Sequence, residues 1–283
     1  MAYGFEAYKE DGSILFETER ICYGLIKSGY LDLVDRWGRH YLRSINLPPN
    51  ESDSWRYQDF RDPICAITVT DAQSPIVFLS GDGTPCGDSF SGNSRTMYFH
   101  GVSPGTKAYV FDLMRDVGAR DGMECYSSSG ALTFTTGMPP LNIAAAIPAP
   151  ALGPLYPGTT QINGPVYEGG YTEEYLRPWG GDDYYWAKGV RGVGVLSGEL
   201  AAHLTFSRTG TMTQAIGSGA GLQLTCAEGV GGGNGLIRFY FMPSIATTSV
   251  VSSTNASVFF DIPRDRSPTA LVIQTANYPF PFR

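Results

Sequence analysis

The chain has 283 residues, of which 42% are hydrophobic and 17% are charged, and its formal net charge is −7. This length suits one large or two medium domains, and the apolar content excludes a globally disordered chain. The acidic balance argues against a nucleic-acid partner, because such binding depends on clustered Lys and Arg. Membrane insertion is not expected either, since no run approaches the roughly 18 apolar residues of a membrane helix. The opening residues Met1 to Glu6 lack the basic and apolar regions of a secretion signal.

Alternating apolar residues predict a β-rich N-terminal half. Tyr3, Phe5 and Ala7 alternate with more polar neighbours, and Asp11-Gly12 then supplies a turn before the next alternating run. Asp-Gly between two such runs is typical of a β-hairpin, because Gly accepts positive φ at no steric cost. Further strand-like runs occur at 64–70, 75–80, 96–102, 107–114 and 131–135. We expect residues 1–138 to form a β-rich domain.

An uncharged segment divides the chain. Residues 125–167 contain no Asp, Glu, Lys or Arg, and several prolines in this segment favour extended backbone. A flexible linker is normally charged or rich in Gly and Ser, so a segment of this composition is expected to lie against protein. We predict a connector at 139–165 that packs against its own domains or a neighbouring subunit.

The C-terminal half repeats the β pattern more densely. Short runs rich in Val, Ile, Thr or Phe occur at 192–196, 199–207, 211–216, 221–225, 236–242, 247–252, 257–262 and 269–275. Their spacing of roughly ten residues is typical of a sandwich or jelly roll. Only 23–35 and 190–204 offer weak helical alternatives. The predicted fold is therefore all-β: an N-terminal β-rich attachment domain followed, at 166–283, by a C-terminal β-sandwich or jelly-roll-like domain.

No metal or cofactor site is predicted. The five cysteines form no CxxC pair, which favours reduced thiols over a disulfide framework or a zinc site. His100 and His203 sit in strand-like runs without a second ligand at a useful spacing, and His40 follows Trp37-Gly38-Arg39 in an expected loop.

Two strings resemble known catalytic or phosphate-binding motifs without completing them. Pro85–Gly92 contains Gly-Asp-Ser, as in chymotrypsin-like proteases, but Phe90 and Ser91 replace the glycines that build the oxyanion turn. The glycine run at 229–235 leads into another strand-like run, whereas a dinucleotide fingerprint must lead into a helix. We interpret the first as a polar turn and the second as a long hairpin loop.

Acidic and aromatic residues gather in one segment of the second half. The ligand or interface residues predicted there are Trp179, Asp182, Asp183, Tyr184, Tyr185 and Trp186. Tyr and Trp are enriched at protein interfaces, and their rings could also stack on sugars while the carboxylates bind hydroxyl groups. A third reading is a glycosidase that uses Glu173, Glu174, Asp182 or Asp183.

Two segments resemble a known family. Residues 2–16, with Tyr3-Gly4-Phe5 followed by Asp11-Gly12, resemble the N-terminal hairpin of tail-tip and tail-fibre proteins of long-tailed bacteriophages. Ser103 to Asp112 resembles a second recurrent strand of the same group. The resemblance implies a virion component at the distal tail, assembled in the host bacterial cytoplasm and commonly trimeric. It implies no catalytic residues.

The leading hypothesis is accordingly a structural component of a bacteriophage tail tip or fibre that contributes to host-surface recognition. Its expected partners are copies of itself, other tail-tip or baseplate proteins, and a glycan or protein receptor on the host cell. No enzymatic activity and no cofactor are expected. The alternatives are a carbohydrate-binding module and a glycan-degrading enzyme.

Overall fold

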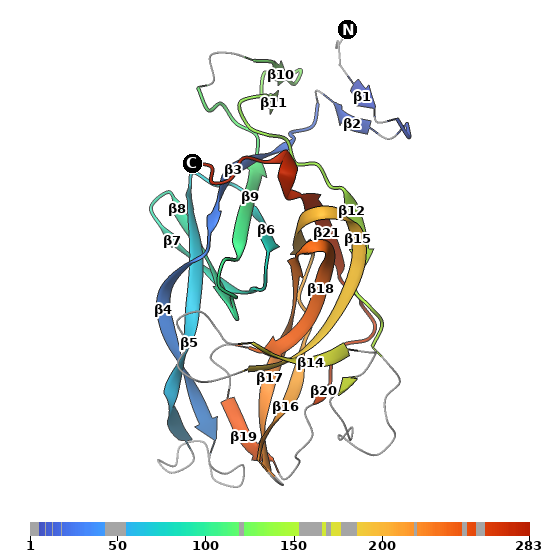
Figure 1. Ribbon diagram of the computed structural model, residues 1–283. Coiled ribbons are helices and arrows are strands. Elements are labelled where there is room, and N and C mark those ends of the chain that lie inside the picture. Colours follow the sequence, from blue (N-terminus) through green and yellow to red (C-terminus); the bar gives the residue numbers. More distant parts are fainter. Residues whose placement is uncertain are drawn as a thin grey trace.

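The computed structural model describes most of the chain, and it is all-β as predicted. The described residues are 6–8, 10–12, 14–17, 19–42, 55–118, 122–152, 166–167, 171–176, 186–217, 220–244, 248–252 and 258–283. Within these ranges the helical structure is one 3-10 turn, η2 (Thr275–Asn277). Among the described residues, seventeen strands form one hydrogen-bonded network, and two hairpins form separate two-stranded sheets (Figure 1).

The N-terminal half contains two antiparallel sets of strands around one core. The first set runs in the order β3 (Tyr23–Tyr30), β9 (Lys107–Leu113) and β6 (Ile76–Ser80). The second runs in the order β4 (Asp32–Leu42), β5 (Trp55–Thr70), β8 (Ser94–His100) and β7 (Thr84–Ser91). Buried side chains from both sets, among them Ile26, Ile67, Met97 and Val110, make up the core between them. Alternation of apolar residues along each strand supplies this inward face.

The C-terminal half is built around one long strand, β15 (Trp186–Leu204). Its first part pairs with β14 (Tyr171–Leu176) and β18 (Asn234–Pro243), and its last part pairs with β21 (Thr269–Gln274). The remaining strands are β12 (Ala145–Pro148), β13 (Val166–Tyr167), β16 (Thr209–Gly217), β17 (Ala220–Gly232), β19 (Thr248–Ser252) and β20 (Val258–Phe260). Phe239, Phe241 and Val272 are central to the buried cluster of this half.

The two halves share strands and a core. Leu79 of β6 pairs with Ala202 of β15, and β4 pairs in parallel with β19. A third buried cluster joins Phe78 and Phe111 of the first half to Ile273 of the second. The predicted boundaries at 138 and 165 remain a prediction. Within the predicted connector, β12 pairs with β21.

The glycine run lies inside strands, so the interpretation as a long loop is wrong. Residues 229–232 belong to β17, and Asn234 and Gly235 already belong to β18. These glycines permit close backbone approach: a Cβ on Gly231 would lie 2.1 Å from the carbonyl oxygen of Gly81, and one on Gly232 would lie 2.0 Å from that of Leu200. Because these glycines have no side chains, the backbone of β17 can lie close to the backbone at Gly81 in the first half and at Leu200 in β15.

Other local predictions also differ from the structure. The run at 192–196 and most of the run at 199–207 fall in a single strand, β15. The weak helical alternatives at 23–35 and 190–204 lie in strands β3, β4 and β15, apart from Leu31 between β3 and β4. The string Pro85–Gly92 is expected to be a polar turn, but its residues 85–91 belong to β7 (Thr84–Ser91). The predicted hairpin at the start of the chain is confirmed as β1 (Glu6–Tyr8) and β2 (Ile14–Glu17), with Ala7 opposite Phe16.

Candidate functional site

The sequence-predicted aromatic and acidic site falls largely outside the described residues. Trp179, Asp182, Asp183, Tyr184 and Tyr185 lie there. Trp186 is the first residue of β15, and its backbone pairs with that of Leu176. Glu173 and Glu174 belong to β14, opposite Gly189 and Lys188. Whether these residues form one site stays a prediction.

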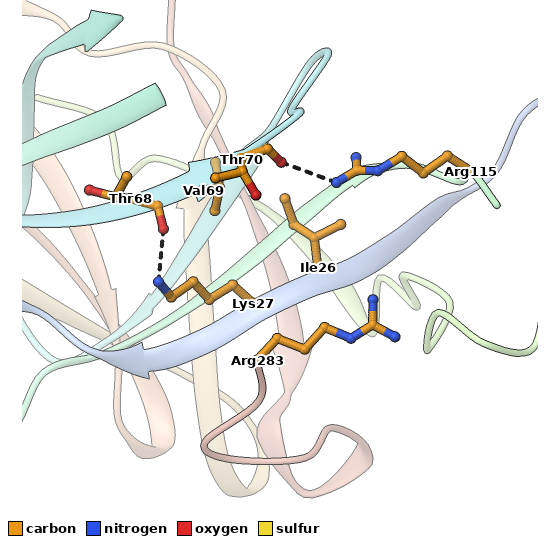
Figure 2. A pocket seen from close by; sticks show the side chains of 7 residues that line it. All are labelled: Ile26, Lys27, Thr68, Val69, Thr70, Arg115 and Arg283. Carbon is orange, nitrogen blue, oxygen red and sulfur yellow. Dashed lines mark hydrogen bonds between the residues drawn. The ribbon is translucent and has the colours of Figure 1, made fainter. Parts of the chain in front are cut away.

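The structure instead shows a cationic pocket at the edge of the N-terminal half. It has a volume of about 260 Å³ and is lined by Ile26, Lys27, Thr68, Val69, Thr70, Arg115 and Arg283. Three of these seven residues are cations and none is acidic. Figure 2 shows that the cations come from three separate segments, with Ile26 lying between Lys27 and Arg115.

A β-bulge in β3 directs the Lys27 side chain toward the cationic pocket. Leu25 pairs with Phe111 and Lys27 pairs with Val110, so Ile26 is the extra residue. Leu25 and Phe111 belong to the cluster shared by the two halves, whereas Ile26 and Val110 belong to the core of the N-terminal half. The bulge therefore puts Ile26 and Lys27 on the same side of the sheet, where strict alternation would have separated them.

Lys27 and Arg115 reach across to an edge of β5. The Lys27 Nζ donates a hydrogen bond to the carbonyl oxygen of Thr68 at 2.8 Å, and Arg115 donates one to that of Thr70 at 3.2 Å (Figure 2). The pairing of β4 with β5 ends at Ala66. The two cations thus hold carbonyl groups on β5 beyond its pairing with β4, and they join the two sets of strands at the pocket.

Buried Asp112 positions Arg115. Its carboxylate is fully buried and accepts hydrogen bonds from the backbone N–H groups of Gln73 and Ser74 at 2.8 and 2.7 Å. It also accepts one from Arg115 at 3.1 Å. Because a buried carboxylate is costly unless it is paired and hydrogen-bonded, these three donors explain why Asp112 is tolerated. The hydrogen bond from Arg115 to this fixed carboxylate orients the guanidinium group toward the pocket.

Arg283 supplies the third cation from a segment that lies beside β3. The backbone groups of Phe282 and Ser28 exchange two hydrogen bonds, at 2.9 and 3.0 Å. The Arg283 guanidinium stacks over the Phe282 ring at 4.8 Å and donates to the carbonyl oxygen of Gly137 at 3.3 Å. Residues 27, 115 and 283 are so far apart in the sequence that no local spacing could have indicated this pocket.

A second cavity, of about 280 Å³, lies where the two halves meet. Apolar residues of both halves line it, together with His203 and Glu228. The His203 Nδ1 lies 3.1 Å from the carbonyl oxygen of Val77, and burial lowers the pKa of this imidazole, against the opposing effect of that hydrogen bond. Glu228 is held by Arg208 through hydrogen bonds of 2.7 and 2.8 Å between buried side chains.

The remaining motif residues have structural partners. Ser89, in the protease-like string, shares a 2.8 Å hydrogen bond with the hydroxyl of Tyr98, and Asp88 pairs with Arg95.

All five cysteines are free, and burial raises the pKa of Cys65 to about 11 and of Cys226 to about 12. Within the described ranges, no group of three or more potential ligands is arranged to hold a metal ion. The same part of the chain contains no helix with the length and apolar character needed to cross a bilayer.

The fold and the pocket together define an all-β protein with a small cationic cavity between two sets of strands. No protein-family model, no curated protein and no solved structure matches the chain.

Proposed function

We propose that this chain is a structural component of a bacteriophage tail tip or fibre that attaches to the distal tail and contributes to host-surface recognition. The proposal starts from the resemblance of residues 2–16 and 103–112 to proteins of that class. A virion location and a trimeric state are parts of the same proposal.

The isolated N-terminal hairpin is the structural observation that supports it best. Strands β1 and β2 pair with each other as a separate two-stranded sheet. Figure 1 draws this hairpin at one end of the molecule, apart from the main body. A two-stranded hairpin alone is at best marginally stable in water, and it needs further strands or a packing partner. A neighbouring subunit or another tail protein would supply that partner.

The rest of the architecture is compatible with a rigid carrier of binding surfaces. Strand pairs, a shared core and the buried Asp82–Lys188 ion pair join the two halves. Phe90, on β7, is 72% exposed and offers an apolar contact for a neighbour. Tail proteins multiply weak receptor contacts by presenting several copies on one assembly.

The test compares the solution mass of the full chain with that of a variant lacking residues 1–18. Light scattering during size-exclusion chromatography is expected to give a mass near three times 30.6 kDa for the full chain. If the hairpin packs against a neighbouring subunit, the shortened variant should form a smaller oligomer than the full chain. A full chain that stays monomeric at every concentration would contradict the trimer, and sugar binding by that monomer would then favour the carbohydrate-binding alternative.

A further inference from the structure

We propose that the cationic pocket formed by Lys27, Arg115 and Arg283 binds the anionic group of an acidic sugar, either a phosphate or a carboxylate. The binding site itself rests on the geometry of these residues. Its use in recognising a host-surface polymer rests on the proposed function.

The charge of the pocket is the first support. The chain carries an excess of acidic residues, yet none of the seven lining residues is acidic. Asp112 balances Arg115 by direct contact. The hydrogen bonds that Lys27 and Arg283 donate go to neutral carbonyl oxygens, at 2.8 and 3.3 Å. The pocket therefore keeps a positive charge that an anion can neutralise.

The donors are also suited to an anion. A lysine ammonium has three N–H donors and a guanidinium has five. The single bonds from Lys27 to Thr68 and from Arg283 to Gly137 leave further donors on each group. Hydrogen bonds from such cations to a phosphate or carboxylate are shorter and stronger than those between neutral groups. Contacts with β5 and Asp112 hold Lys27 and Arg115 in place, which reduces the entropy lost on binding.

The size and the lining favour a single sugar unit, free or within a polymer, over a bare ion. A volume of about 260 Å³ is larger than one phosphate needs and lies just below the usual range, about 300–1,000 Å³, of pockets for drug-sized ligands. Ile26 and Val69 line the pocket with apolar atoms although both side chains belong mainly to the core, and Thr68 and Thr70 add polar groups. One acidic sugar unit matches this mixture.

A purely structural role must be weighed for Lys27. An inward-pointing charge and a bulge on an edge strand both protect against edge-to-edge association. That role would need only the lysine. It does not explain why Arg115 and Arg283, from two other segments, line the same hollow.

The experiment is calorimetric titration of the full chain with four ligands: glucose 1-phosphate, glucuronate, inorganic phosphate and glucose. We expect at least one of the two acidic sugars to bind more tightly than inorganic phosphate, and glucose not to bind. Whichever acidic sugar binds more tightly identifies the anionic group. The affinity should fall with added salt, because the contacts are charged.

The main variants are Lys27→Gln and Arg283→Gln. Each should weaken binding by about tenfold or more, the loss expected for a hydrogen bond to a charged group. Arg264→Gln is the matched control: Arg264 is an exposed arginine that donates to the carbonyl oxygen of Leu152 at 3.4 Å, much as Arg283 does to Gly137, and it does not line the pocket. It should bind like the parent chain. Thermal unfolding of each variant confirms that it is folded.

Equal binding of glucose, or unchanged binding in both pocket variants, would overturn the proposal. So would the absence of any anion binding, with Lys27→Gln instead causing self-association. The outcomes also separate this inference from the proposed function. A trimer that binds no acidic sugar defeats only the pocket, whereas an acidic-sugar-binding monomer defeats the trimeric assembly and leaves the pocket intact.

Discussion

Lys188 and Asp82 form an ion pair that joins the two halves of the protein. The Lys188 Nζ lies 2.7 Å from Asp82 Oδ2, and the two side chains are 2% and 8% exposed. Arg238 lies 3.8 Å from the same carboxylate oxygen. Beside the pair, the Tyr240 hydroxyl donates to the carbonyl oxygen of Gly83 and accepts from the Gly83 N–H, both at 2.8 Å. Buried polar groups of the two halves thus pair with one another at this junction.

Asp82→Ala is expected to lower the free energy of unfolding by about 3–5 kcal/mol, because it leaves the Lys188 charge buried without this partner. Denaturation by urea measures the change. Asp265→Ala is the control, since the Asp265–Arg266 pair is exposed and 3.7 Å long, and its loss should change stability little.

The double variant Asp82→Asn with Lys188→Met separates pairing from burial. Because it removes both charges together, it should be less destabilised than the sum of the two single variants. Additive effects would show that the pair contributes nothing beyond its separate side chains.

Gly232→Ala is expected to destabilise the fold by about 3 kcal/mol or to displace β17 from β15, since its Cβ would lie 2.0 Å from the carbonyl oxygen of Leu200. The control is Gly194→Ala, also in a β-strand. Nothing lies within 4 Å of a Cβ there, so we expect the control to be neutral or slightly stabilising. Equal effects of the two substitutions in thermal unfolding would refute the argument from close approach.

Local patterns predicted the strands well where neighbouring residues decide the structure. The Asp11-Gly12 hairpin and the strand at 107–113 are examples. The predicted break between 196 and 199 was wrong for a physical reason. Gly198 does adopt a positive φ of 87°, but it serves a shift of register inside β15 and not a turn. A bulge and a turn use the same glycine chemistry, so the sequence does not distinguish them.

The sites depend on contacts that no local pattern encodes. Lys27 enters the cationic pocket because of a bulge that pairing with β9 defines, and Arg115 and Arg283 arrive from distant segments. The partners Asp82 and Lys188 are separated by 106 positions. The glycines at 229–232 show the converse: the sequence singled them out, but their role becomes visible only from the backbone that passes over them.

Glu199 is expected to make stability depend on pH below the ordinary range of carboxyl titration. Burial tends to raise its pKa, but hydrogen bonds from Lys107, Thr275 and Ser80, with the Lys107 charge, outweigh this and lower it below 4.5. The stabilisation by the ionised Glu199 carboxylate is therefore fully present above pH 4.5, the pKa in the unfolded chain. It is lost as the pH falls through the lower pKa of the folded chain. Glu199→Gln should flatten the dependence of the melting temperature on pH in this acid window. An identical profile for both chains would contradict the assignment. The effect should be modest, because the side chain is 41% exposed.

His203 is expected to act at higher pH and in a different way. Its imidazole lies beside an apolar cavity and 5.6 Å from the Phe78 ring, and burial lowers its pKa below 6.5 although the hydrogen bond to Val77 opposes this. The unfolded chain therefore takes up the proton first, and stability falls as the pH drops below 6.5 toward the folded value. Unfolding free energies at pH 7.5 and 5.5 should differ in the parent chain and differ less in His203→Gln. Glu199→Gln serves as the control, since its titration lies below this window and it should keep the parent's difference. If His203→Gln keeps the full difference between the two pH values, another group carries the pH dependence of stability. The neutral His203 imidazole would then not be its source.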